Sequence, residues 1–119
     1  MKKPISDPPA CTANLLAMRD TIETLGGKWK LLILHYLMTR KESSNTFKKI
    51  EKDIPGISAK MLSKELKDLE VNGLVSRKVL DTKPIKVEYS ITEYGLSTKP
   101  LIDLLVSWGQ IHRLRVTTK

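Results

Sequence analysis

Three lysines recur at helical spacing in one short stretch, and their chemistry suits them to bind a polyanion. Lys60, Lys64 and Lys67 are separated by four and three residues, and Ser63 lies beside them. On an α-helix this spacing places the four side chains on one face. Ammonium and hydroxyl groups in such a row hydrogen-bond to phosphate oxygens and to the edges of nucleic-acid bases. The alternative for a single row of this kind is a solvated face without a partner.

The lysine row belongs to an amphipathic helix with recognisable ends. Leu62, Leu66 and Leu69 repeat the same spacing two positions later. Two residues rotate a helix by about 200°, so the leucines lie nearly opposite the lysines. Ser58 is expected to cap the N-terminus and Gly73 to end the helix. We therefore predict a helix that packs its leucines on a core and turns its lysines to solvent.

The other reactive side chains form no catalytic or metal-binding pattern. The two histidines stand apart among apolar residues, and the single cysteine, Cys11, has no partner for an internal disulfide. No nucleophile is paired with a base, and no Cys/His cluster has metal-ligand spacing. Glu65, Asp68 and Glu70 are interpreted as ordinary ion pairs on an exposed helix. We expect no enzyme activity, no metal and no cofactor.

The helices and strands expected around this helix follow the order of a known fold. We expect helices over residues 12–25, 28–38, 47–53, 58–73 and 92–117, and strands over 74–80 and 86–91. Asn45 or Thr46 is expected to cap the third helix and Thr92 the last, in which Pro100 marks a kink or the true start. The fold class is mainly α with a small β-hairpin (α+β), arranged as a winged helix-turn-helix. In that arrangement the second helix of the motif enters the major groove of DNA.

Length and charge agree with this interpretation. The 119 residues suit one domain, and a net charge of +8 with a pI near 9.7 favours polyanion partners. No apolar run is long enough to span a membrane, and residues 1–10 are expected to be a flexible arm and not a secretory signal. One cysteine fits a reducing compartment, so we expect a cytoplasmic protein without membrane contact.

The terminal helices carry more apolar surface than a small body can cover. Residues 11–119 are expected to form the winged helix-turn-helix domain, in which residues 11–25 and 92–117 supply the dimerisation helices. A surplus apolar face of this kind favours a second copy in a two-fold homodimer. The residues expected at the dimer interface are Leu15, Ile22, Leu101, Leu104, Leu105, Trp108 and Ile111.

Four ordered blocks carry a family resemblance. Residues 25–34 read LGGKWKLLIL and resemble the IGGKW-x-LLIL hallmark of HxlR-type transcriptional regulators, a winged-helix group related to the MarR regulators. Residues 47–58, 66–77 and 87–95 resemble further blocks of that family. The resemblance implies a dimeric bacterial DNA-binding regulator that places its second motif helix in the major groove and its wing on the flanking backbone. The expected partner is double-stranded DNA with a pseudo-palindromic operator.

The expected DNA contacts form two sets. Residues at the start of the recognition helix are expected to contact base edges: Ala59, Lys60, Met61, Ser63 and Lys64. Residues expected at the backbone are Lys48, Ser58, Lys67, Arg77, Lys83 and Lys86. The family's arginine after the GLI-x block corresponds to Arg77. Two alternatives stay open: Met61 is a core residue, or Ser58 is a cap without a phosphate contact.

Cys11 falls where many family members carry a cysteine, and in some members that residue senses electrophiles or oxidants. Here Thr12 follows it, where the family usually has proline. A small electrophile or an aromatic effector would then change DNA binding. A ligand-responsive regulator without thiol sensing, whose ligand lies against an apolar lining between the dimer helices and the winged domain, is the alternative. A winged-helix protein-interaction module and a nonspecific nucleic-acid binder are the competing functions, and the aromatic content of 5% disfavours single-strand stacking.

Overall fold

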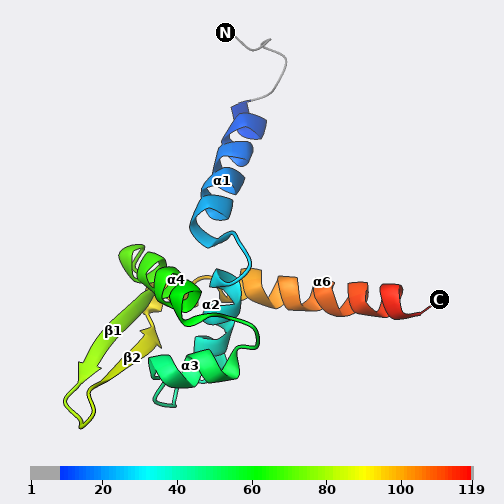
Figure 1. The fold of residues 1–119 in the computed structure, drawn as a ribbon. Coiled ribbons are helices and arrows are strands. Elements are labelled where there is room, and N and C mark those ends of the chain that lie inside the picture. The colour runs from blue at the N-terminus through cyan, green and yellow to red at the C-terminus, as the bar shows by residue number, and fades with distance from the viewer. Residues whose placement is uncertain (1–8, 119) are drawn as a thin grey trace.

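The order of elements in the structure, a computed structural model that describes residues 9–118, follows the predicted one (Figure 1). The elements are α1 (Pro9–Leu25), α2 (Lys30–Thr39), α3 (Phe47–Asp53), α4 (Ala59–Val71), β1 (Val75–Leu80), β2 (Lys86–Ile91), α5 (Glu93–Leu96) and α6 (Lys99–Thr117). Helices and one two-stranded antiparallel hairpin make a winged helix-turn-helix, which confirms the predicted fold class. Within the described residues, no helix is both long and apolar enough to cross a membrane.

Helix α2 is the centre of the core. Its Ile33, Leu34 and Leu37 are fully buried, as the apolar run of the sequence predicted. The hydroxyl of Tyr36 donates to Asp53 Oδ2 at 2.7 Å, which ties the end of α3 to α2. A helix of seven residues is unstable in isolation, so α3 depends on this contact and on its cap.

The hairpin is fixed to the helices by the loop before α3. Register pairs Val75 with Ile91 and Arg77 with Tyr89. Tyr89 N donates to Asn45 O at 2.8 Å, so β2 gains backbone pairing on its outer side. A lone hairpin is marginal in water, and this second edge supplies support that the strands alone lack. Of the two predicted caps of α3, Thr46 is the one that accepts from the helix, while Asn45 is buried.

The expected bounds of the first and last helices differ most from the structure, and α2 begins at Lys30 instead of residue 28. Helix α1 begins at Pro9, so Cys11 lies in its first turn and not before it. Residues 9 and 10 of the expected arm are therefore helical, and the remainder of that arm lies outside the described residues. The helix begins early because Pro9 suits a first turn, where its missing N–H would have no partner.

The expected single helix over residues 92–117 is two helices. Thr92 caps α5 by accepting from Gly95 N at 2.9 Å, and α6 then begins at Lys99 with Pro100 in its first turn. Pro100 therefore marks the true start, because proline inside a helix removes a hydrogen bond and clashes with the preceding turn. Helices α1 and α6 extend away from the winged body in different directions (Figure 1).

Candidate nucleic-acid interface

The solvent face of α4 carries the residues that the sequence singled out. Lys60, Ser63, Lys64 and Lys67 are all exposed. The opposite face is buried, since the side chains of Leu62, Leu66 and Leu69 are fully covered by the core. Core packing on one side therefore fixes which way the lysine row points, as predicted.

The first turn of α4 is also accessible. Ser58 Oγ accepts from Met61 N at 3.1 Å, which confirms the predicted N-cap. Met61 is 38% exposed, so the alternative that it is a core residue is wrong. Ala59 is exposed beside it, and both side chains remain available for apolar contact with a thymine methyl group.

An ion cluster joins α4 to α2 and consists of Lys64, Glu65 and Asp68 of α4 with Lys30 of α2. Lys30 Nζ lies 3.1 Å from Glu65 Oε2 and 3.5 Å from Asp68 Oδ2, and Lys64 Nζ lies 3.3 Å from that same Asp68 oxygen. The interpretation of Glu65 as an exposed residue is wrong, because its side chain is only 6% exposed. Glu65 follows Leu62 by three residues and precedes Leu66 by one, so helical periodicity places it on the leucine side, and the exposed interpretation came from its charge alone.

The charges of this cluster perturb one another. The hydrogen bond from Lys64 is the main reason that the pKa of the Asp68 carboxyl lies below its usual value. The same bond raises the pKa of the Lys64 ammonium. Lys64 is therefore cationic over the whole physiological range, and its exposed ammonium group is partly engaged before any partner arrives.

Two of the expected backbone contacts lie across one polar hollow between α4 and the hairpin. Lys67 of α4 and Arg77 of β1 both line this space of about 330 Å³, together with Ser63, Glu70 and Tyr89. Arg77 is exposed, whereas Tyr89 is buried. A guanidinium and an ammonium on either side of a hollow suit a phosphate oxygen, while Glu70 opposes one.

Three other expected backbone contacts lie on α3 and the wing. Lys48 and Lys86 line a second hollow, of about 490 Å³, between the start of α3 and the wing. Lys83 is exposed in the turn that joins the strands. The structure therefore brings Lys67 together with Arg77 and Lys48 together with Lys86, while Ser58 stands at the start of α4 and Lys83 in the turn of the wing.

The terminal helices present an apolar surface in the single chain. Six of the seven expected interface residues are exposed, and Leu101 is instead partly buried against the core. Trp108 stacks on His112 at 5.0 Å between ring centroids, a contact that the sequence analysis did not predict. Cys11 is exposed in α1 and lies beside Leu15 and Met18.

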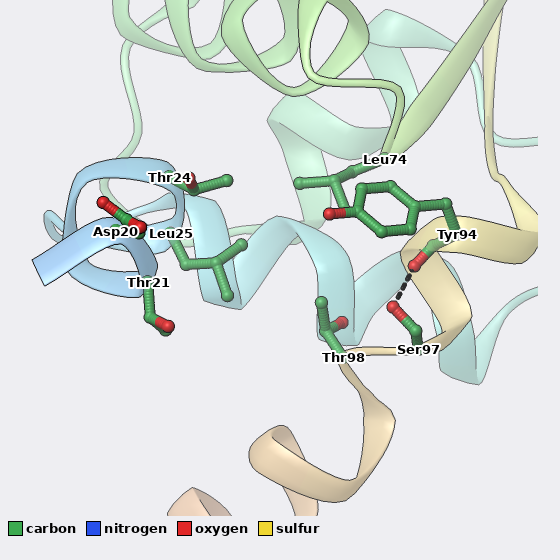
Figure 2. A pocket seen from close by; sticks show the side chains of 8 residues that line it. All are labelled: Asp20, Thr21, Thr24, Leu25, Leu74, Tyr94, Ser97 and Thr98. Atoms are coloured by element: carbon green, nitrogen blue, oxygen red, sulfur yellow. Dashed lines mark hydrogen bonds between the residues drawn. The ribbon is translucent and has the colours of Figure 1, made fainter. Parts of the chain in front are cut away.

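Two hollows separate α1 from the winged body. One, of about 380 Å³, is almost wholly apolar and includes Met18, Ile22 and Leu105, as expected for this region. The other, of about 200 Å³, differs from the apolar lining that was expected. It is lined by a carboxylate and several hydroxyl groups in addition to Leu25 and Leu74 (Figure 2). Its polar residues come from α1 and from the α5–α6 junction, and they are Asp20, Thr21, Thr24, Tyr94, Ser97 and Thr98.

Comparison with known proteins places this chain in one family. Residues 24–116 match the model of the HxlR-like helix-turn-helix family. The HTH-type transcriptional regulator YkvN of Bacillus subtilis is 48% identical over 89 residues, which cover 75% of this chain and 73% of YkvN.

Solved structures agree with that match. The regulator YtcD superposes with a TM-score of 0.73 at 37% identity, over 80% of this chain and 94% of YtcD. The redox regulator HypR in its reduced form superposes with a TM-score of 0.75 at 30% identity, over 87% of this chain and 99% of HypR. This chain therefore belongs to the HxlR-like helix-turn-helix family and is a transcriptional regulator.

Proposed function

We propose that the protein is a sequence-specific DNA-binding regulator that acts in the cytoplasm as a homodimer. One observation carries this proposal: the lysine face of α4 is exposed while the leucine stripe opposite is fully buried. Each protomer then places α4 in the major groove, with Lys60, Ser63 and Lys64 toward base edges. Met61 and Ala59 supply apolar contact there.

Cations on α3, β1 and β2 support the proposed contacts with the DNA phosphate backbone. Lys67 and Arg77 share one hollow, and Lys48 and Lys86 share another on the far side of β2. These groups flank α4 with positive charge, so that phosphates on either side of the groove meet a cation. Ser58 adds a helix N-terminus, whose free N–H groups favour an anion.

The exposed apolar faces of α1 and α6 support the homodimer. Leu104, Trp108 and Ile111 are exposed on α6, and Leu15 and Ile22 are exposed on α1. Exposing large apolar side chains to water costs free energy, which burial against a partner recovers. A two-fold axis through these helices pairs two recognition helices with a pseudo-palindromic operator.

The test is fluorescence anisotropy with duplex DNA from upstream of the protein's own gene, against a scrambled duplex of equal length. Wild-type protein is expected to prefer the native duplex, and Lys60→Met to weaken that binding. Lys99→Met is the matched control, because Lys99 lies on α6 and pairs with Asp103 at 2.7 Å. If about six cations pair with phosphates per dimer, log affinity is expected to fall with log salt at a slope near −5. Equal binding to both duplexes contradicts sequence-specific regulation and leaves nonspecific binding.

A winged-helix module that binds a protein instead of DNA is the second candidate. It predicts that Lys60→Glu with Lys64→Glu leaves the partner contact intact. The exposed lysine row disfavours this function, because a protein-binding winged helix needs no cations there.

We also propose that Cys11 makes the regulator responsive to electrophiles or oxidants. The thiol is exposed in the first turn of α1, where an electrophile can reach it. The similarity to HypR, a redox regulator, supports the same role. With a quinone, the sulfur forms a bond to a ring carbon and the thiol proton passes to a ring oxygen.

Treatment with a quinone is expected to change DNA affinity for wild type and not for Cys11→Ser. Mass spectrometry of the treated protein gives the adduct at the single thiol. A response that persists in Cys11→Ser contradicts thiol sensing and favours an effector bound in the hollows beside α1.

A further inference from the structure

The recognition helix has no excess positive charge of its own. Its sequence contains three lysines and three carboxylates, so its formal net charge is zero. These residues are Lys60, Lys64, Lys67, Glu65, Asp68 and Glu70. A helix balanced in this way attracts phosphate only if its carboxylates are neutralised by groups outside the helix.

Lys30, at the start of α2, is such a group. Its ammonium lies 3.1 Å and 3.2 Å from the two oxygens of Glu65 and 3.5 Å from Asp68. The Lys30 side chain is 12% exposed and that of Glu65 is 6% exposed, so this pair is held in a poorly solvated site. Removing one partner of a buried ion pair leaves the other charge without compensation, which is strongly unfavourable.

Lys64 shares these carboxylates but is free to move. It lies 3.3 Å from Asp68 and 3.5 Å from Glu65, and its side chain is 66% exposed. When Lys64 turns toward DNA, Lys30 stays behind with the two carboxylates, and the residual formal charge is −1. Without Lys30 the same movement leaves −2 at the edge of the DNA-binding face, and that charge holds Lys64 back.

We propose that Lys30 is a positioning residue for DNA binding, which neutralises Glu65 and Asp68 and so releases Lys64 to contact DNA. This inference rests on the proposed DNA-binding function. Lys30 itself contacts no DNA, because its ammonium group is enclosed between α2 and α4. Its effect passes through Lys64. Substituting Lys30 is therefore expected to change the salt dependence of DNA binding, and Glu65→Gln is expected to reverse that change, which a purely structural residue would not show.

The test measures affinity for the native upstream duplex over a range of salt concentrations. In Lys30→Met, Lys64 is expected to stay on the carboxylates, so the dimer loses two cations from the DNA groove, where they neutralise phosphate charge as well as facing base edges, and the salt slope becomes less steep by up to about 2. At 0.1 M salt each lost cation is worth about eightfold, so affinity is expected to fall on the order of 60-fold. Lys30→Met with Glu65→Gln restores a residual charge of −1 and is expected to restore both slope and affinity.

Two further variants separate this role from folding. Lys30→Arg retains the cation and is expected to bind as wild type does. Glu65→Gln alone retains a hydrogen-bond acceptor for Lys30 and leaves a neutral pair when Lys64 moves, so it is expected to bind DNA severalfold more tightly. This variant keeps the inference falsifiable even if Lys30→Met fails to fold in a circular dichroism melt.

Lys60→Met is the matched control, because it removes a cation of α4 that has no ion pair among the described residues. Lys60→Met is expected to make the salt slope less steep, and adding Glu65→Gln is not expected to restore that slope. The inference is overturned if folded Lys30→Met keeps the wild-type slope, if Glu65→Gln does not restore it, or if Glu65→Gln alone weakens binding. Wild-type protein that binds no duplex at low salt overturns the proposed function itself, and this inference falls with it.

Discussion

Ser58 is a position at which an aspartate substitution is expected to raise the folding stability and lower the DNA affinity. Its hydroxyl accepts from Met61 N at 3.1 Å, and it caps the recognition helix. Ser58→Ala removes that acceptor and is expected to cost about 1 kcal/mol of folding free energy. Ser58→Asp keeps an acceptor and places a carboxylate at the positive end of the helix, which adds about 0.3–1 kcal/mol of stability. Stability is therefore expected to rank Asp first, Ser next and Ala last.

Affinity is expected to follow another order if the start of α4 faces phosphate. A carboxylate about 6 Å from one phosphate charge costs about 0.7 kcal/mol in bulk water. Two protomers make that about 1.4 kcal/mol, which is a tenfold loss of affinity. Ser58→Ala loses only the hydroxyl contact, so affinity is expected to rank Ser first, Ala next and Asp last.

Urea unfolding and fluorescence anisotropy on the same duplex measure the two orders. Ser58→Asn is the matched control, because it caps without a charge and is expected to bind more tightly than Ser58→Asp. If Ser58→Asp binds as tightly as Ser58→Asn, the start of α4 does not face the DNA backbone. If Ser58→Ala unfolds at the wild-type urea midpoint, the hydroxyl contributes no cap energy.

Four other variants test the helices, the core and the dimer. A Cβ at Gly95 would lie 2.2 Å from a backbone oxygen, whereas one at Gly109 meets no described atom within 4 Å. Gly95→Ala is therefore expected to cost about 1–3 kcal/mol and Gly109→Ala to gain up to about 1 kcal/mol, measured by urea midpoints. Burial and the hydrogen bond to Asp53 raise the pKa of Tyr36 from 10.0 to about 12. The folded state keeps a proton that the unfolded state loses, so thermal melts are expected to show stability falling from pH 10 to 12, and falling less in Tyr36→Phe. Trp108→Glu is expected to yield a monomer in sedimentation equilibrium with unchanged circular dichroism, and a persistent dimer contradicts the α6 interface.

Elements with strong local signals were predictable from the sequence. The helix over residues 47–53 was placed correctly, and Thr46 was one of the two caps considered for it. The recognition helix between Ser58 and Gly73 was also placed correctly, because a cap, a leucine stripe and a glycine stop act within its own residues. Gly73 has a φ of 75°, a conformation that glycine adopts without strain. These signals depend on neighbours in the chain and need no tertiary contact.

Features that depend on distant contacts were not predictable. The buried pair of Lys30 and Glu65 joins residues that are 35 positions apart. The polar hollow beside α1 likewise joins Asp20 to Ser97 and Thr98 of the α5–α6 junction. The position of Glu65 between Leu62 and Leu66 signalled that it lies on the leucine side of α4, but nothing in that spacing identified Lys30 as its partner. Which glutamate a neighbouring helix covers is decided by how the helices pack.

Under the proposed function, the affinity for DNA depends on cations from several elements and not on the recognition helix alone. The net charge of +8 does not reside in α4, whose own formal charge is zero. The positive surroundings come from Lys48 on α3, Arg77 on β1 and Lys86 on β2, while α2 supplies the cation that covers Glu65. Transplanting α4 into another winged helix would therefore transfer its base contacts without its affinity. Transplanting it together with a lysine at the position of Lys30 is expected to recover the part of that affinity carried by Lys64.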